Sequence, residues 1–204
     1  MWGQKEKNLN RIMGYMKAAA KKGSDLVVFP EMALTAYDDE PEKPLAEKMQ
    51  YKLAETVPGP STDAIAELAK KLGLYVVMGM PIKDATGDYH KMHLPAPEPN
   101  WATRGDAPFI LDTPWGPVGC AICYDNYCFP ELMDYYVAKG CRLCINSTAL
   151  AHCHGKCLGD KTLQAQVIRE GVFIASANLG GLDKDNYFWG GSSIIGPSAK
   201  TWEP

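Results

Sequence analysis

Apolar positions in the first part of the chain follow two different spacings, which predict two kinds of element. A helical spacing of three and four residues connects Leu9, Ile12, Met13 and Met16. We expect this helix to end near Gly23, and the apolar run 25–29 that follows is typical of a strand buried on both faces. The same succession predicts a second helix that ends at residue 72, with Ser61 or Thr62 as its N-terminal cap, and a strand over 74–80.

Helical and strand-like segments also alternate along the second half. The turn Pro-Trp-Gly-Pro joins two apolar stretches, and we expect a hairpin there. Further helices are predicted over 130–140 and 160–171, and further strands over 141–146, 172–178 and 190–196. Such alternation predicts a layered α/β domain, in which reactive groups gather beyond the carboxyl ends of the strands. Glu31 and Cys123 stand at two such ends.

Two C-x2-C pairs, Cys120/Cys123 and Cys141/Cys144, have the spacing of a zinc site or a redox pair. We place both pairs inside strands, where residues i and i+3 point to opposite faces and cannot share a metal. A redox pair would open a helix, whereas Tyr124 and Asp125 come between Cys123 and the helix expected near Pro130. We therefore expect Cys120, Cys141 and Cys144 to be buried packing residues. The tract "AHCHGKC" is another metal candidate, and we favour a polar loop there.

Composition limits the possible partners. The chain has 204 residues, of which 46% are hydrophobic and 22% are charged, with a net charge of −3. This mild acidity gives no reason to expect nucleic acid or a membrane surface as a partner, and no apolar run is long enough to span a bilayer. Seven cysteines among apolar residues, without an apolar leader, favour a reduced cytoplasmic protein.

Three blocks of the sequence carry a family resemblance. The segments "DLVVFPEMALTAYD", "YHKMHL" and "GCAICYDNYCFPEL" resemble the signature blocks of the nitrilase superfamily, the carbon–nitrogen hydrolases. The segments "GVFIASAN" and "WGGSSIIGPSAK" resemble two further blocks. The resemblance implies an α-β-β-α sandwich with two sheets packed face to face, which forms homodimers or larger homo-oligomers.

The resemblance also implies a chemistry without metal or cofactor. In it Cys123 is the nucleophile, Glu31 the general base and Lys91 the cation that stabilises the oxyanion together with the backbone N–H of Tyr124. Glu98 resembles a second glutamate that positions the substrate. The implied reaction hydrolyses a small linear amide or N-carbamoyl compound through a thioester. Nitrile hydrolysis by the same residues is the alternative, although Tyr-Asp after the cysteine favours amides.

The chain also departs from the family pattern. We expect a single domain over residues 1–204 that is shortened at both ends and between residues 81 and 90. A missing strand there would leave unpaired backbone groups and an exposed apolar edge. A non-catalytic relative that acts as a binding or assembly subunit therefore remains a second hypothesis. His90 and His93 flank Lys91, and we expect a loop or core role for both.

Overall fold

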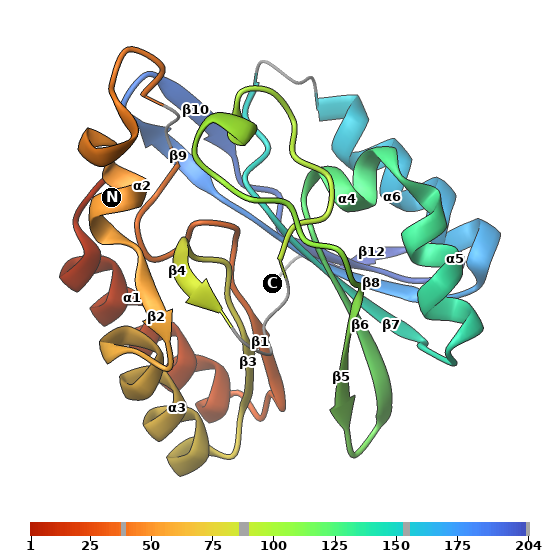
Figure 1. The fold of residues 1–204 in the computed structure, drawn as a ribbon. Coiled ribbons are helices and arrows are strands. Elements are labelled where there is room, and N and C mark those ends of the chain that lie inside the picture. The colour runs from red at the N-terminus through yellow and green to blue at the C-terminus, as the bar shows by residue number, and fades with distance from the viewer. Residues whose placement is uncertain (38–39, 86–89, 153–155, 203–204) are drawn as a thin grey trace.

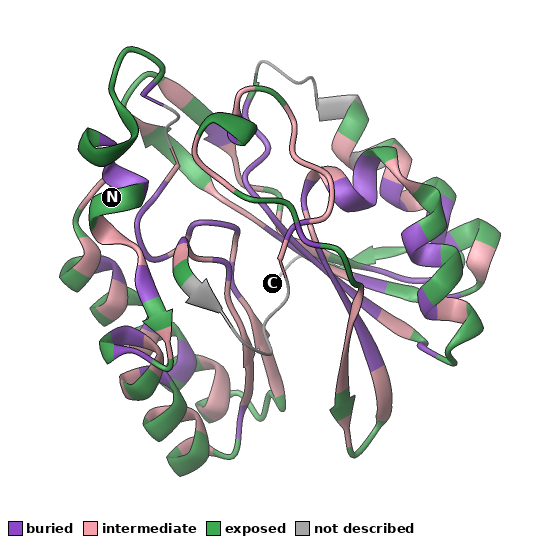
Figure 2. Ribbon diagram, viewed as in Figure 1, coloured by how far each residue is buried: buried purple, intermediate pink, exposed green. Residues whose placement is uncertain are grey.

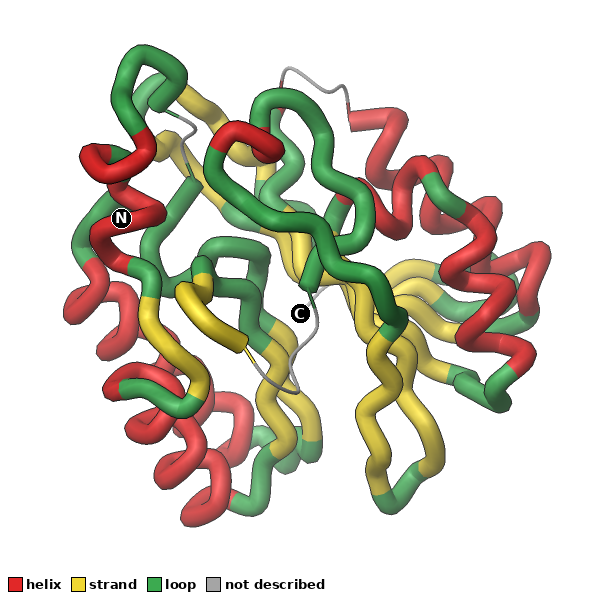
Figure 3. Tube along the Cα trace, viewed as in Figure 1, coloured by secondary structure: helices red, strands yellow, loops and turns green. Residues whose placement is uncertain are grey.

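The computed structural model describes residues 1–37, 40–85, 90–152 and 156–202 (Figures 1 and 3). The helices are α1 (Lys5–Lys21), α2 (Met49–Leu53), α3 (Pro60–Leu72), α4 (Tyr124–Cys128), α5 (Pro130–Ala138) and α6 (Lys156–Glu170), with short 3-10 turns η1 (Leu45–Glu47) and η2 (Glu98–Asn100). The strands are β1 (Leu26–Val28), β2 (Glu55–Val57), β3 (Tyr75–Val77), β4 (Ile82–Ala85), β5 (Phe109–Thr113), β6 (Gly116–Ile122), β7 (Leu143–Thr148), β8 (Phe173–Asn178), β9 (Gly180–Asp183), β10 (Asn186–Trp189), β11 (Ser193–Ile195) and β12 (Thr201–Trp202).

A six-stranded sheet forms one half of the molecule, with the strand order β12-β11-β8-β7-β6-β5. Its central strands β6, β7 and β8 run parallel, and the chain returns between them through α4, α5 and α6. Parallel strands need such crossover helices, and these cover the outer face of the sheet (Figure 1). The other half contains the parallel pair β1–β3, with α1 and α3 outside it, and a second parallel pair, β2–β4.

Three apolar clusters separate the layers, and buried residues concentrate along the central strands (Figure 2). Ile12 and Met16 of α1 pack with Ile65 of α3 against the β1–β3 pair. A second cluster lies between the sheets and includes Val118 and Ile145, together with side chains of β1, β3 and β5. A third joins α5 and α6 to the outer face of the six-stranded sheet. The layers are therefore helix, sheet, sheet, helix, as predicted.

Most expected elements are confirmed, some with shifted ends. The hairpin is formed by β5 and β6, with Thr113 opposite Gly116 across the two-residue turn. Gly23 and Gly73 have the positive φ angles, 80° and 69°, that favour glycine after a helix. The second helix begins at Pro60, so neither Ser61 nor Thr62 is its cap; instead, the Thr62 hydroxyl accepts a hydrogen bond from the N–H of Gly59.

The expectation that the two cysteines of a C-x2-C pair point to opposite faces of a strand is met by the first pair and not by the second. Cys120 lies in the cluster between the sheets and Cys123 in the cluster under the helices, so this pair does point to opposite faces. The expectation was wrong for the second pair, because β7 begins only at Leu143 and Cys141 precedes it. Cys141 and Cys144 consequently lie in the same cluster. All three packing cysteines are buried, as expected.

Several elements had no clear sequence signal, namely α2, β2, β4, β12 and the antiparallel pair β9–β10. These strands have at most four residues, which is too short to show a period in the hydrophobic pattern. Within the described ranges, no helix combines the length and the apolar character needed to cross a bilayer. The predicted single domain and its shortened segments stay predictions.

Candidate active site

Two strand ends bring Glu31 and Cys123 to the same place. Glu31 follows β1 and Cys123 follows β6, which belong to the two different sheets. Ser147 of β7 connects these ends, because its carbonyl accepts the N–H of Cys123 (2.9 Å) and its hydroxyl donates to the carbonyl of Phe29 (2.7 Å). The backbone N–H of Ala149 donates to Oε2 of Glu31 at 3.1 Å. The backbone of Ala149 also lowers the pKa of the Cys123 thiol, against the larger effect of burial.

Cys123 occupies an unusual backbone conformation between strand and helix. Its φ and ψ angles are 49° and −103°, which a residue with a side chain rarely adopts and which functional sites often retain. Helix α4 begins at the next residue, so the expectation that Tyr124 and Asp125 separate Cys123 from a helix was wrong. Tyr124 is the first residue of α4, and its N–H has no acceptor within that helix.

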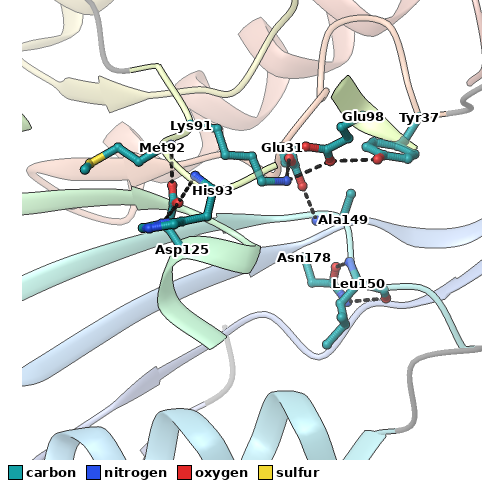
Figure 4. A network of polar contacts seen from close by, with 10 residues as sticks. All are labelled: Glu31, Tyr37, Lys91, Met92, His93, Glu98, Asp125, Ala149, Leu150 and Asn178. Atoms are coloured by element: carbon teal, nitrogen blue, oxygen red, sulfur yellow. Dashed lines mark hydrogen bonds and ion pairs between the residues drawn. The ribbon is translucent and has the colours of Figure 1, made fainter. Parts of the chain in front are cut away.

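Lys91 lies between two carboxylates (Figure 4). Its Nζ donates to Oε1 of Glu31 at 2.9 Å and to Oε1 of Glu98 at 2.7 Å. The same Glu98 oxygen accepts a hydrogen bond from the Tyr37 hydroxyl at 2.7 Å. Glu31, Lys91 and Glu98 expose only 7%, 8% and 2% of their surfaces, so water screens these charges little. The interactions fix the ammonium group in position.

Burial and charge set the protonation states. Burial would lower the pKa of Lys91, but the charge of Glu31, and the charge and hydrogen bond of Glu98, raise it above its ordinary value, so the ammonium stays protonated. Burial raises the pKa of Glu98 to about 7, assisted by the Glu31 carboxylate and opposed by Lys91 and Tyr37. Burial also raises the pKa of the Cys123 thiol to about 12, with Glu31 adding to the rise and Lys91 opposing it. The resting cysteine is consequently a thiol.

A buried aspartate connects the Lys91 loop to the helix after Cys123. Oδ1 of Asp125 accepts the N–H of His93 at 2.8 Å and lies 2.9 Å from its Nδ1, while Oδ2 accepts the N–H of Met92 at 3.3 Å (Figure 4). The His93 ring stacks on Phe129, with 3.5 Å between the ring centroids. The expected loop role of His93 is consistent with these contacts, although the contact between Asp125 and the His93 ring was not predicted from the sequence.

A glycine permits close backbone contact between the segment after β3 and the segment after β1 that carries Glu31. An ideal Cβ on Gly79, just after β3, would lie 2.7 Å from Cα of Glu31 and 3.2 Å from Oγ of Ser147. Real side chains do not fit at the first distance, so only glycine allows this backbone contact. Gly79 thereby places the backbone of Glu31 next to the end of β3.

A cavity of about 520 Å³ opens onto this network. Its lining includes Glu31, Lys91, Glu98 and Trp101. Ile122, the residue before Cys123, also lines it. This volume suits a small organic molecule, which would contact the carboxylates and the ammonium directly.

The structure brings together four of the five residues singled out from the sequence, Glu31, Lys91, Glu98 and Cys123, and the fifth, Tyr124, directly follows Cys123 in the chain. Sequence reasoning missed Tyr37 and Asp125. Both lie inside recognised blocks, six residues after Glu31 and two after Cys123, but neither spacing indicates a contact across the fold.

Among the described residues, no three His, Cys, Asp or Glu side chains are grouped to hold a metal ion. The other metal candidate, the tract 151–157, lies partly outside the described residues, at positions 153–155. His152 is described, and its ring lies 6.2 Å and 6.3 Å from those of Tyr187 and Trp189.

Comparisons with known proteins agree with this architecture. The family model described as carbon-nitrogen hydrolase matches residues 1–88 and 81–202. The Omega-amidase NIT2 of Xenopus tropicalis is 30% identical over 220 residues, which cover 95% of this chain and 76% of the relative. An amidase from Nesterenkonia sp. has a TM-score of 0.82 at 22% identity, over 98% of this chain and 80% of that chain.

A variant of the amidase from Nesterenkonia sp. AN1 is similar as well, with a TM-score of 0.80 at 21% identity over 98% of this chain and 80% of that one. It is described as showing covalent addition of the acetamide moiety of fluoroacetamide at its active site cysteine. The match of the family model over nearly the whole chain, on an α-β-β-α fold, establishes that this protein belongs to the carbon-nitrogen hydrolases of the nitrilase superfamily.

Proposed function

We propose that this protein is an amidase that hydrolyses the carbon–nitrogen bond of a small linear amide or N-carbamoyl compound. One observation carries the proposal: a buried ammonium, Lys91, is hydrogen-bonded to two carboxylates, Glu31 and Glu98, beside the thiol of Cys123. Similarity to omega-amidases and to an amidase whose cysteine takes up an acetamide group supports the same reaction class.

The first step needs a base, because the Cys123 thiol is protonated at neutral pH. Glu31 accepts the thiol proton as the sulfur attacks the carbonyl carbon of the amide, which forms a C–S bond and a tetrahedral oxyanion. The hydrogen bonds from Lys91 and Ala149 hold one Glu31 oxygen each and thereby orient the carboxylate. Coupling proton transfer to attack avoids a free thiolate in a buried site.

The oxyanion requires donors that are in place before the charge develops. The Lys91 ammonium and the N–H of Tyr124 supply them in this proposal, since the first is fixed by two carboxylates and the second has no acceptor within α4. Each such donor is typically worth about 3–4 kcal/mol in the transition state. Glu98 keeps Lys91 in this position and lines the cavity in which the substrate lies.

The intermediate then collapses with loss of the nitrogen. The C–N bond breaks, Glu31 returns its proton to the leaving group, and ammonia or an amine departs while the acyl group stays on sulfur as a thioester. Glu31 next takes a proton from a water molecule that attacks the thioester carbon. The C–S bond breaks, the acid leaves and the thiol of Cys123 is restored.

The test measures ammonia and acid released from a panel of short primary amides, N-carbamoyl compounds and nitriles. We expect equal amounts of both products from amides and lower turnover of nitriles. Lys91→Met removes the fixed cation and lowers kcat by about 100-fold to 1000-fold.

The matched control is Lys139→Met, which removes a lysine from the exposed end of α5 and leaves turnover unchanged. A folded wild-type protein that releases no ammonia from any amide contradicts the proposal and favours a non-catalytic role. Full activity of Lys91→Met contradicts the proposed oxyanion site.

A further inference from the structure

A second cavity of about 600 Å³ lies beside the candidate active site, between the two sheets. Strand β3 and helix α3 form one wall, and the hairpin of β5 and β6 forms the opposite wall (Figure 1). This cavity plays no part in the steps proposed above.

The second cavity continues from the first. Gly79, Met80, Ile82 and Ile122 line both. Two of these four residues adjoin the reacting groups, because the backbone of Gly79 lies against that of Glu31 and Ile122 precedes Cys123. A molecule whose amide lies in the first cavity beside Glu31 and Lys91 can therefore extend past these shared residues into the second cavity.

The two cavities differ in charge. The first is lined by Glu31, Lys91, Glu98 and further polar groups, whereas Lys70 is the only charged residue among the described ones that line the second. Most other lining side chains of the second cavity are aliphatic or aromatic. Such a cavity favours an uncharged apolar occupant over a carboxylate or an ammonium group.

Strand β3 explains why this apolar space remains unfilled. Among the described strands it pairs only with β1, and every residue from Leu74 to Met80 lines the cavity. These residues include side chains on both faces of β3. The cavity therefore runs along the edge of β3 that does not pair with β1. The side chains of Val76, Met78 and Leu111 are only partly buried, although their types are typical of a protein core.

We propose that the second cavity binds an apolar tail of the substrate, so that the preferred substrates are amides with an aliphatic chain of six or more carbons. The inference rests on the amidase function proposed above and specifies its substrate class. An alkyl chain that enters from the shared residues covers the partly exposed side chains and removes their apolar surface from water. The amide group stays in the polar cavity with Glu31 and Lys91.

The test compares kcat/KM for ammonia release from acetamide, butyramide, hexanamide and octanamide. Each buried methylene is expected to raise kcat/KM by about threefold to fourfold, until the cavity is full. Direct binding gives a second readout: octanamide binds the Cys123→Ala protein more tightly than butyramide by calorimetry.

A blocking variant locates the tail. Ala66 lies on the exposed side of α3 and lines only the second cavity, so Ala66→Trp fills it without disturbing the core. We expect this variant to lose at least tenfold in kcat/KM for octanamide and less than twofold for butyramide. The matched control is Glu67→Trp, at an exposed neighbouring position that is not part of the lining, which leaves both values unchanged.

The outcomes separate this inference from the proposed function. If butyramide is hydrolysed but chain length and Ala66→Trp have no effect, the tail site is wrong while the amidase proposal stands. If Ala66→Trp instead changes the oligomeric state measured by light scattering, the cavity is an interface between copies and the inference is overturned. If no amide is hydrolysed but octanamide still binds Cys123→Ala and not its Ala66→Trp derivative, the amidase proposal fails and the tail site is retained.

Discussion

At the scale of single residues, Lys91 makes the ion pairs that connect the other charged residues of the candidate site. The Lys91 ammonium pairs with Glu31 and Glu98, and it opposes the effect of Glu31 on the pKa of Cys123. Removing one partner from such a buried arrangement leaves a charge without compensation, which costs more than the interaction contributes. The identities of Glu31, Lys91 and Cys123 were predictable from their sequence blocks. The Tyr37 contact to Glu98 was not, because it joins positions 61 residues apart.

Glu98 predicts a specific dependence of stability on pH. Burial raises its pKa in the folded protein from 4.5 to about 7, so the folded state binds the proton more tightly than the unfolded chain. Its contribution to stability is therefore present below pH 4.5 and is lost as the pH rises towards 7, at no more than about 1.4 kcal/mol per pH unit.

Urea unfolding of wild type and Glu98→Gln at pH 5 and pH 7 measures this contribution. We expect the wild type to lose stability relative to the variant over this interval. The control Glu42→Gln changes an exposed glutamate and follows the wild type at both pH values. Parallel curves for wild type and Glu98→Gln would show that the pKa of Glu98 is not raised.

Gly79→Ala tests the close contact behind Glu31. The new Cβ would lie 2.7 Å from a backbone carbon, so the end of β3 or the Glu31 segment must move. We expect the free energy of unfolding to fall by about 1–3 kcal/mol and kcat to fall as well. Urea unfolding and ammonia release measure the two effects.

Gly14→Ala is the matched control for this glycine. It lies within α1 and has no heavy atom within 4 Å of an added Cβ, so alanine stabilises the protein by up to about 1 kcal/mol without a change in kcat. An equal gain in stability from Gly79→Ala would refute the steric account of this position.

At the scale of elements, α4 connects Cys123 to the segment that follows Lys91. The helix begins directly after Cys123, and its buried Asp125 accepts two backbone N–H groups from the segment that follows Lys91. The strand–helix alternation was readable from hydrophobic periodicity, whereas α4 was not, because five residues show too little of a helical period. This short helix nevertheless sets the direction in which the Tyr124 N–H points.

Asp125→Asn tests the connection between α4 and the Lys91 loop. An amide has one acceptor oxygen and one NH₂ group, so it cannot accept from both Met92 and His93 through two oxygens. We expect Lys91 to shift, and kcat to fall by about 100-fold with a smaller change in KM. Steady-state kinetics on a primary amide, together with the pH profile of kcat, measure the effect.

The control applies the same substitution to the exposed Asp134 of α5, which pairs with Arg169. Asp134→Asn changes neither kcat nor its pH profile, since surface ion pairs contribute little. If Asp125→Asn lowers only stability and leaves kcat and its pH profile intact, the aspartate has a purely structural role.

At the scale of the whole molecule, the layers were predictable and the cavities were not. Buried strands between amphipathic helices predicted a layered α/β domain, because each layer needs an apolar partner, and the family resemblance of the sequence blocks implied the sandwich. The open edge of β3 and the apolar space along it depend on which strands pair, and β2 and β4 form a separate pair instead of extending the β1–β3 sheet. No local pattern in the sequence encodes that choice, because pairing is settled by contacts between distant segments.

The central claim is that Cys123 is the nucleophile of an amidase, and one comparison tests it most directly. Ammonia release from a primary amide is measured for Cys123→Ala and for Cys128→Ala, which removes an exposed cysteine at the end of α4. The account predicts that Cys123→Ala is folded and has no measurable turnover, while Cys128→Ala retains the wild-type rate. Turnover at the wild-type rate in folded Cys123→Ala would contradict it.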